Sequence, residues 1–227
     1  MKKVLIVTLK KWNITNYQKF KKRHNKNIKC YIVSNNSKLK ISYLKKINPD
    51  LIFFLHWSSK VKKNIINNFN CFNFHMTDLP FGQGGTPLQN LLFRDIEKTK
   101  ISLIKMNEKI DEGNIIYKEN FLLNGSAGEI YNALSNQSYK IIEKIIKKKK
   151  IIDVKQTGKL IKFSRIKFNN LLIKKKQTLK NIYNQIRMRD ADTYEKTYVQ
   201  KGKFRIYLYD SKIKSKNIYG KFKITKV

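Results

Sequence analysis

The stretch Cys71-Phe-Asn-Phe-His-Met-Thr-Asp-Leu-Pro80, continued by Phe81-Gly-Gln-Gly-Gly-Thr-Pro87, joins an apolar run with a polar end to a glycine-rich turn. A helix-like segment follows. Strand, polar tip, glycine turn and helix, in this order, are how an open α/β sheet presents chemistry at the carboxyl ends of its strands. Asn73 and His75 are two residues apart, so on a strand their side chains point to the same face. The stretch therefore predicts an α/β fold with a site at the end of this strand.

The polar residues at this strand end suit acyl-transfer chemistry. Asn73 can offer an amide N–H to a developing oxyanion, and His75 can take a proton near neutral pH. An Asn and a His at a strand end are also common as structural groups, and the pair alone does not decide between the two. Asp111, which follows another apolar run, adds a carboxylate that could orient and charge-stabilise the imidazole. The three residues are therefore candidate catalytic groups.

These motifs resemble a known family. Asn-x-His-x-Thr-x-Leu-Pro at 73–80, the glycines and proline at 82–87 and Asp-x-Gly at 111–113 are similar to the formyltransferases that use N10-formyltetrahydrofolate. The resemblance extends over residues 1–200. Gln83 departs from the pattern, because similar sequences usually have an arginine there.

One branch of the family is more similar than the others. The loop Phe74–Pro80, the segment Gly84–Asn90 and the stretch Ile186–Tyr194 look like the enzymes that formylate the amino group of nucleotide-linked deoxyamino sugars. The resemblance thus implies an N-formyltransferase that moves a formyl group from N10-formyltetrahydrofolate to such a sugar, for example for a surface glycan such as O-antigen. It gives the catalytic roles to Asn73, His75 and Asp111, and which of them is the base stays open.

Other readings remain. Similar enzymes formylate glycinamide ribonucleotide or methionyl-tRNA, and the latter carry a further barrel domain for which the residues after 150 leave little chain. A non-enzyme alternative is a basic RNA-binding module on the same fold, but the presence of Asn73, His75 and Asp111 argues against it.

The resemblance also implies which residues bind the two substrates. The loop after the apolar run 51–55 and the turn before Asp111 would form the pterin pocket. The candidate folate contacts are Ser58, Val61, Leu79, Pro80, Asn107 and Ile110. The acceptor would lie over the glycine turn, where backbone N–H groups can approach a phosphate or sugar closely. The candidate acceptor contacts are Trp12, Asn13, Thr77, Gln83, Gly84, Gly85, Arg165 and Arg187, with Arg189 as a further anion partner. Trp12 could equally fill the core, and the two helix-end arginines could equally be solvated.

Apolar runs alternate with helix-like segments along the first two thirds of the chain. The runs at 4–7, 28–33, 51–55 and 71–75 read as strands, which predicts a Rossmann-like, doubly wound and mostly parallel sheet. No Gly-x-Gly-x-x-Gly follows the first run, so a nicotinamide dinucleotide site is not expected.

Composition shifts near residue 150. We expect a catalytic domain at 1–150 and a small C-terminal region at 151–227, built from one helix and a β-hairpin, that serves dimerisation or acceptor binding. The hairpin edge could pair in a homodimer or could be capped within the chain.

The chain of 227 residues has a formal net charge of +35. The excess is mostly lysine and is spread along the sequence. Only 147–150 and 174–176 form lysine runs, and neither is interleaved with aromatic residues as a base-stacking surface would be. We therefore expect no specific nucleic-acid partner, although a positive surface would attract anionic folate and nucleotide-sugar ligands.

The remaining features bear on compartment and cofactors. Cys30 and Cys71 lie in apolar runs, which predicts reduced core residues and a cytoplasmic protein. No histidine has metal-ligand spacing with the cysteines, so no metal is expected. No apolar run is long enough for a membrane span.

Overall fold

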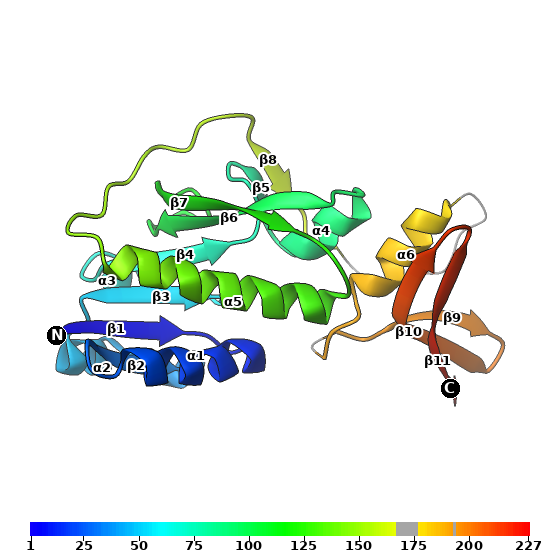
Figure 1. The fold of residues 1–227 in the computed structure, drawn as a ribbon, viewed down its shortest axis with the longest axis horizontal. Helices are drawn as coiled ribbons and strands as arrows, with labels where there is room; N and C mark the ends of the chain where they lie inside the picture. The colour runs from blue at the N-terminus through cyan, green and yellow to red at the C-terminus, as the bar shows by residue number, and fades with distance from the viewer. Residues whose placement is uncertain (167–176, 193) are drawn as a thin grey trace. The chain divides into compact units, whose positions relative to one another are not determined.

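A computed structural model describes residues 1–166, 177–192 and 194–227 (Figure 1). The chain divides into two compact units, each assembled from segments that are far apart in sequence. Unit 1 comprises Met1–Gln83, Lys100–Asn120 and Asn132–Lys162, and unit 2 comprises Gly84–Thr99, Phe121–Tyr131 and Phe163–Val227. The expected division into a catalytic domain at 1–150 and a small C-terminal region at 151–227 stays a prediction.

Unit 1 is organised around a six-stranded sheet in the order β2-β1-β3-β4-β6-β7 (Figure 1). The strands are β1 (Lys2–Val7), β2 (Ile28–Val33), β3 (Leu51–Leu55), β4 (Cys71–His75), β6 (Lys98–Lys105) and β7 (Ile115–Leu122). β1 pairs in parallel with β2 and β3, and β3 pairs in parallel with β4, whereas β6 runs antiparallel to β4. All of β3 is buried, as expected for a parallel strand covered on both faces. This mostly parallel α/β sheet confirms the expected Rossmann-like fold class.

Helices cover both faces of this sheet. They are α1 (Lys11–His24), α2 (Ile41–Ile47), α3 (Lys63–Ile66) and α5 (Ala127–Ile146), with a 3₁₀ turn at Asn36–Lys38. Leu5 and Val7 share a core cluster with Leu44 of α2 and Ile65 of α3. The alternating residues of β1 are equally buried but lie outside that cluster, so they face the other side.

α1 and α5 pack against each other. The rings of Phe20 and Tyr139 have centroids 5.4 Å apart, and the amide of Asn16 donates to Ser135 Oγ at 2.9 Å. α5 lies in front of the sheet in Figure 1 and runs roughly along the direction of its strands. The two helices thus form one covering layer over unit 1.

Several local expectations can be compared with the observed elements. Ser126 with Glu129 three residues later predicts a capping box at a helix start. The structure has it, because Ser126 N–H donates to Glu129 Oε2 at 2.8 Å and Glu129 N–H donates to Ser126 Oγ at 3.3 Å. Residues 12–14, which the sequence suggests as a loop, belong to α1. Residues 151–154 do not form a strand of their own, and only Val154 bridges to Ile115.

Unit 2 contains two helices and a C-terminal sheet. The helices are α4 (Pro87–Phe93) and α6 (Leu179–Arg187), and the antiparallel strands are β9 (Thr197–Lys201), β10 (Phe204–Lys214) and β11 (Asn217–Lys226), in the order β11-β10-β9. The predicted hairpin is present as β10 and β11, and β9 joins it as a third strand. A further pair, β5 (Phe81–Gly84) and β8 (Ile161–Phe163), belongs mostly to unit 1. The sequence of residues 163–170 also suggests a loop, of which residues 167–170 lie outside the described part.

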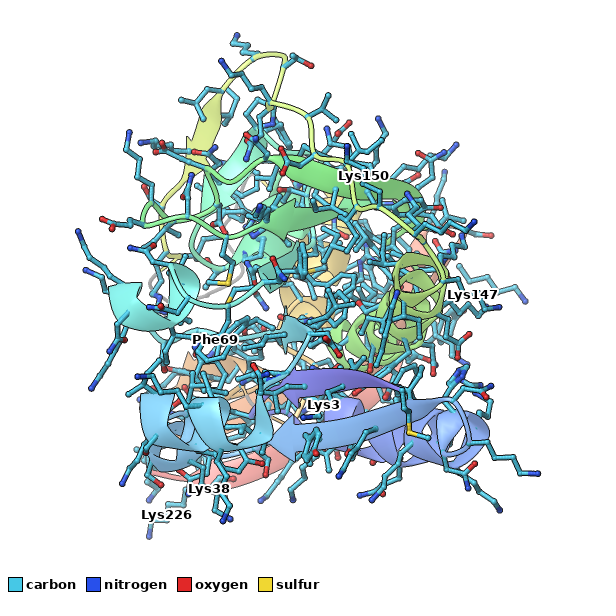
Figure 2. All side chains as sticks on the ribbon, turned by 90° about the vertical axis from the view of Figure 1, so that its left-hand side faces the viewer. Lys3, Lys38, Phe69, Lys147, Lys150 and Lys226 are labelled. Atoms are coloured by element: carbon cyan, nitrogen blue, oxygen red, sulfur yellow. The ribbon has the colours of Figure 1, made fainter. Side chains whose placement is uncertain are left out.

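The labelled lysines and the two cysteines differ in their exposure to solvent. Lys38, Lys147 and Lys150 are exposed, and Lys38 lies well apart from Lys147 in Figure 2. Cys71 is buried and Cys30 half-buried, and neither forms a disulfide. Burial raises the pKa of Cys71 to about 12 and also raises that of Cys30. None of the helices in the described ranges combines the length and apolar character needed to cross a membrane.

Candidate active site

Asn73 lies on β4, the strand with which the fold prediction began. Its neighbours across the sheet are Phe54 on β3 and Ile104 on β6. The side chain is half-buried, and within the described residues it forms no hydrogen bond. Because polar groups inside a protein are normally paired, an amide left unpaired at a strand end is available to a ligand.

His75 is two residues further along the same strand and is held by two oxygen atoms. Its Nε2 lies 2.8 Å from the carbonyl oxygen of Gly82, and since a carbonyl only accepts, Nε2 carries a proton and donates. Its Nδ1 lies 3.4 Å from Asp111 Oδ1, and the two side chains are only 7% and 8% exposed. Nδ1 is therefore the ring nitrogen that faces the carboxylate.

The turn that carries Asp111 joins β6 to β7. Asp111 adopts the left-handed conformation, with φ of 58°. Gly113 has no room for a side chain, because a Cβ there would overlap the carbonyl oxygen of Lys105. Only glycine at this position lets β6 approach the turn so closely. The Asp-x-Gly motif thus has a steric basis.

Two residues of this site are not among the sequence candidates. Gln156 donates from Nε2 to the carbonyl oxygens of Asp111 and Gly113, at 2.7 and 2.8 Å. A single glutamine in a lysine-rich stretch forms no motif, so no pattern indicates it. Gly82 orients His75 with its carbonyl, and its φ of 78° is a feature that the glycine-rich turn could have suggested.

The candidate folate contacts divide into exposed and buried side chains. The exposed ones are Ser58, Asn107 and Ile110, and the buried ones are Val61, Leu79 and Pro80. Ile110 is 74% exposed although apolar, and it directly precedes Asp111. Leu79 is fully buried in a small cluster with Ile104 and Ile115. Its side chain would therefore pack behind a folate pocket and would not be exposed in it.

Three candidate acceptor contacts point into unit 1. Asn13 is fully buried and donates to Thr8 Oγ1 at 2.9 Å. Thr77, also fully buried, donates to the carbonyl oxygen of Gly82 at 3.3 Å. Gln83 is 5% exposed. Thr77 and Gln83 thus contact residues that hold His75, whereas Asn13 lies beside His56, and none of the three side chains is presented to solvent.

Trp12 is half-buried next to a histidine that the sequence analysis does not use. Trp12 Nε1 donates to His56 Nδ1 at 3.3 Å, and the two rings meet edge to face with centroids 5.8 Å apart. Burial, and to a lesser extent the charge of Lys10, lower the pKa of His56 to about 3. The His56 ring is therefore neutral at physiological pH and acts as an acceptor that orients Trp12.

The glycine turn continues in unit 2 with two further candidates. Gly84 has φ of 106°, and a Cβ there would lie 2.6 Å from the carbonyl oxygen of Phe163. Gly85 donates its N–H to the same oxygen at 3.1 Å. Arg165 is exposed, and its Cβ would lie 3.2 Å from a Cβ at Gly85. The structure thus brings Gly84, Gly85 and Arg165 together in unit 2.

The structure corrects the expectation for the two helix-end arginines. Arg187 is 4% exposed and donates to Asn184 Oδ1 and to the carbonyl oxygens of Leu123 and Gly125, at 2.7, 2.5 and 3.0 Å. Arg189 is 2% exposed and pairs with Glu195 at 3.4 Å. Neither is a solvated anion contact. The buried guanidinium of Arg187 finds the internal acceptors that a buried charge requires, and it links α6 to the Leu123–Gly125 segment of unit 2.

Comparison with known proteins adds family information. Residues 163–225 match the family model described as the C-terminal domain of methionyl-tRNA formyltransferase. A methionyl-tRNA formyltransferase of Buchnera aphidicola is 38% identical over 76 residues, which span 33% of this chain and 24% of that protein. The matched stretch is thus about a quarter of that relative's length.

Two solved structures extend the comparison. The protein described as methionyl-tRNA formyltransferase from Clostridium thermocellum is 38% identical with a TM-score of 0.94, and the match covers 100% of both chains. WlaRD, described as a sugar 3N-formyl transferase in the presence of dTDP and 5-N-formyl-THF, is 22% identical with a TM-score of 0.67 over 92% of this chain and 87% of its own. At that identity the second likeness concerns the fold alone.

Proposed function

The chain belongs to the formyltransferase family, and from this premise we propose that it transfers a formyl group from N10-formyltetrahydrofolate to the primary amine of an acceptor. The observation that carries the proposal is the contact of 3.4 Å between His75 Nδ1 and Asp111 Oδ1 beside the unpaired amide of Asn73. An acyl transfer needs a donor for the oxyanion and a route for the amine proton. These three residues supply both.

Each of the three residues has a proposed role. Attack of the amine on the formyl carbon would form a tetrahedral oxyanion, to which Asn73 donates from its side-chain amide. Collapse of this oxyanion would break the bond between the formyl carbon and N10, and the proton lost by the amine would be returned to N10, so that tetrahydrofolate leaves. His75 Nε2 is occupied by Gly82, so the amine proton passes by way of the Nδ1–Asp111 pair. While both ring nitrogens carry protons, the His75 ring is a cation that stabilises the oxyanion electrostatically.

The folate would bind next to the Asp111 turn. N10-formyltetrahydrofolate supplies the formyl group, and a pterin is a flat ring system with hydrogen-bonding edges. Ile110 is a large apolar side chain that is 74% exposed in this turn, which supports a role in covering such a ring. Asn107 shapes the same turn, because its amide donates to the carbonyl oxygen of Glu112 at 3.2 Å. Ser58 is the remaining exposed candidate.

For the acceptor we propose methionyl-tRNA. The full-length likeness to a protein described as a methionyl-tRNA formyltransferase supports this choice over the sugar acceptor suggested by the loop sequences. The C-terminal sheet adds a physical reason. Between Thr197 and Val227, nine basic residues stand against one acidic residue, Asp210. Such an excess suits a polyanion.

One face of the C-terminal sheet combines these charges with aromatic rings. Tyr198 on β9, Tyr207 on β10 and Lys223 on β11 are direct neighbours across the strands. Arg205 lies on the same face, with its guanidinium 4.7 Å from the centroid of the Tyr198 ring. We call Tyr198, Arg205, Tyr207 and Lys223 the aromatic–basic face. Rings that alternate with cations are typical of surfaces that stack and neutralise single-stranded nucleic acid.

This face revises the expectation of no nucleic-acid partner. The lysine runs of the sequence, at 147–150 and 174–176, have no aromatic residues interleaved with them. In an antiparallel sheet the neighbours come from three strands, so Tyr198, Tyr207 and Lys223 are adjacent in space while they are far apart in sequence. A linear pattern does not reveal this arrangement.

A nucleotide-linked amino sugar is the second candidate acceptor. The loops 74–80 and 84–90 resemble that branch, and Arg165 beside Gly85 offers an exposed cation near backbone N–H groups for a diphosphate. Glycinamide ribonucleotide has no specific observation in its favour.

The test is an acceptor panel. The purified protein is given N10-formyltetrahydrofolate with methionyl-tRNA, with nucleotide-linked 3-amino and 4-amino sugars, or with glycinamide ribonucleotide, and release of tetrahydrofolate is measured. We expect turnover with methionyl-tRNA. Turnover with a sugar alone would move the proposal to the second candidate, and no release with any amine would refute transferase activity.

A further inference from the structure

Residues 151–162, which we call the strap, are fastened to the Asp111 turn. Asn114 Nδ2 donates to Asp153 Oδ1 at 2.8 Å. Ile115 and Val154 exchange backbone hydrogen bonds of 2.8 and 2.9 Å. Gln156 continues the contact by donating to the carbonyl oxygens of Asp111 and Gly113. The strap therefore follows the turn that carries the carboxylate.

Two glutamine amides meet at this turn with their orientations determined. Gln156 faces two backbone carbonyls, which only accept, so it must present its NH₂ group there. Its Oε1 then accepts from Gln83 Nε2 at 3.1 Å, and Gln83 Nε2 also donates to the carbonyl oxygen of Asp111 at 3.3 Å. Flipping either amide would place oxygen against oxygen.

The orientation of Gln83 leaves its own oxygen unpaired. Gln83 Oε1 is buried and has no hydrogen-bond partner among the described residues. Burying an acceptor without a partner is unfavourable. The hydrogen bonds that Gln83 Nε2 donates to Asp111 and Gln156 therefore stabilise this orientation of the side chain.

The carbonyl that receives both amides belongs to a residue in an uncommon backbone conformation. A non-glycine residue with φ of 58° persists only where its surroundings hold it. Since the carbonyl and the side chain branch from the same backbone, fixing the carbonyl of Asp111 restrains the Cα–Cβ bond from which its carboxylate extends. That carboxylate lies 3.4 Å from His75 Nδ1.

We propose that Gln156, with Gln83 as its partner, is a positioning residue that holds the Asp111 carboxylate against His75. Neither glutamine touches the reacting atoms in this proposal, and both act through the backbone of Asp111. The inference rests on the proposed function in one respect, namely that the His75–Asp111 pair moves a proton during formyl transfer.

The first test compares two residues that fasten the same strap. Gln156→Met keeps the volume of the side chain and removes the donors to Asp111, whereas Asn114→Ala removes a strap contact that does not involve Asp111. We expect Gln156→Met to lower kcat about 10- to 100-fold, because a small displacement of a catalytic group is costly, with KM for folate and acceptor unchanged. Asn114→Ala should change kcat less than threefold. Equal effects of the two variants would overturn the proposal.

A double-mutant cycle separates positioning from general stability. In an Asp111→Asn background the carboxylate is already absent, so Gln156→Met should cost less than a further twofold in kcat. Losses that multiply would mean that Gln156 acts independently of Asp111. Thermal unfolding of each variant checks folding, and Gln156→Ala, which is smaller, serves if the methionine variant does not fold.

A measurement that needs no catalytic turnover can test the positioning role of Gln156 separately from transferase activity. The ¹⁵N signals of the His75 ring, recorded by NMR, report the surroundings of Nδ1 in the protein alone. They should change in Gln156→Met and remain as in wild type in Asn114→Ala. If the wild type is inactive with every acceptor, transferase activity fails while these spectra still decide the positioning role. Unchanged signals in Gln156→Met would refute it.

Discussion

At the scale of single residues, Asn73 and His75 illustrate two different uses of a strand end. His75 is engaged on both sides, by Gly82 and by Asp111. Asn73 has no internal partner within the described ranges and is half-buried. The polar atoms of this amide are not among the buried groups without a partner, so solvent or a ligand can reach them. The Asn73 amide is therefore the group of the site that is available to hydrogen-bond a substrate.

Replacing Asn73 by alanine should therefore affect the reaction more than the fold. We expect kcat to fall about 100- to 1000-fold, the usual effect of losing one oxyanion donor, with little change in the midpoint of thermal unfolding. The measurement is steady-state release of tetrahydrofolate with the accepted amine. Asn73→Asp is the matched variant, because it keeps the shape and replaces the donor by an acceptor. Near-normal turnover in both would remove Asn73 from the mechanism.

The loop after His75 is anchored by an ion pair that depends on pH. Lys118 Nζ lies 2.5 Å from Asp78 Oδ1 and donates to the carbonyl oxygen of Leu79 at 2.6 Å, and Lys100 lies 2.9 Å from Asp78 Oδ2. Burial opposes the charge of Asp78, but the two lysines outweigh it and lower the pKa of this carboxyl below its ordinary value. The pair therefore stabilises the fold at neutral pH and loses this contribution as pH falls through the lowered pKa.

Lys118→Met should lower the unfolding midpoint at pH 7. The difference from wild type should shrink as the pH falls through the lowered pKa of Asp78, because the wild-type carboxyl then takes up a proton and the ion pair is lost. Thermal unfolding at a series of pH values measures this. Asp78→Asn is the control, since it removes the charge on the other side and should show the same loss of pH dependence. A difference that stays constant from pH 7 to pH 3 would show that only packing is involved.

At the scale of elements, the turn between β6 and β7 combines three constraints. Asp111 is left-handed, Gly113 lies against Lys105, and Gln156 holds both carbonyls from the strap. Each constraint comes from a different part of the sequence. Together the three constraints restrict the turn to one position relative to β4.

Gly113→Ala tests the steric constraint. Its methyl group would overlap the Lys105 carbonyl oxygen, so the turn has to move and carry Asp111 away from His75. We expect a loss of about 1–3 kcal/mol in unfolding free energy and a fall in kcat of about 100-fold. Chemical denaturation and steady-state kinetics measure the two effects. Glu112→Ala, one residue away and half-exposed, should show neither, and an active Gly113→Ala protein would contradict this account of the turn.

The elements also show which parts of the structure could be predicted. The continuous apolar runs of β1, β3 and β4 and the Ser126–Glu129 capping pattern are local signals, and the structure has strands and a helix start at those places. The strap is different, because it is held by pairings with distant segments, namely the bridge between Val154 and Ile115 and the pairing of β8 with β5. Contacts between distant segments leave no local pattern.

The same distinction applies to the candidate site. Asn73, His75 and Asp111 stand in motifs, and the structure brings the latter two within 3.4 Å. The charge of Arg187 near a helix end predicts an anion contact at the surface. In the structure the side chain is only 4% exposed. Whether an arginine faces solvent depends on the carbonyls that the fold gathers around it. The roles of the binding residues remain predictions.

At the scale of the whole molecule, the net charge of +35 has two components: lysines dispersed over the surface, and the basic residues of the aromatic–basic face. Most lysines are distributed over the surface, as Lys38, Lys147 and Lys150 illustrate (Figure 2). Such charge attracts any polyanion without selecting one. The aromatic–basic face differs, because its tyrosines add stacking to neutralisation. The homodimer contact and the functional boundary at residue 150 remain predictions at this scale.

Two lysine variants distinguish the general charge from the local face. Lys223→Gln should weaken binding of methionyl-tRNA and reduce the slope of log affinity against log salt by about 1, as expected for one lost phosphate contact. Lys38→Gln makes the same change in charge on an exposed residue of unit 1 and should have a much smaller effect. Fluorescence titrations at several salt concentrations measure both. Equal effects would assign RNA attraction to net charge alone.

The two cysteines have a practical consequence. Thiol reagents attack the thiolate, and burial raises the pKa of Cys71 to about 12, so that sulfur is protected in the native protein. Cys30 on β2 is partly accessible and is no part of the proposed chemistry. A maleimide dye can therefore be attached at a single known position, which gives unit 1 a fluorescent label while the nitrogen and oxygen groups of the site stay unmodified.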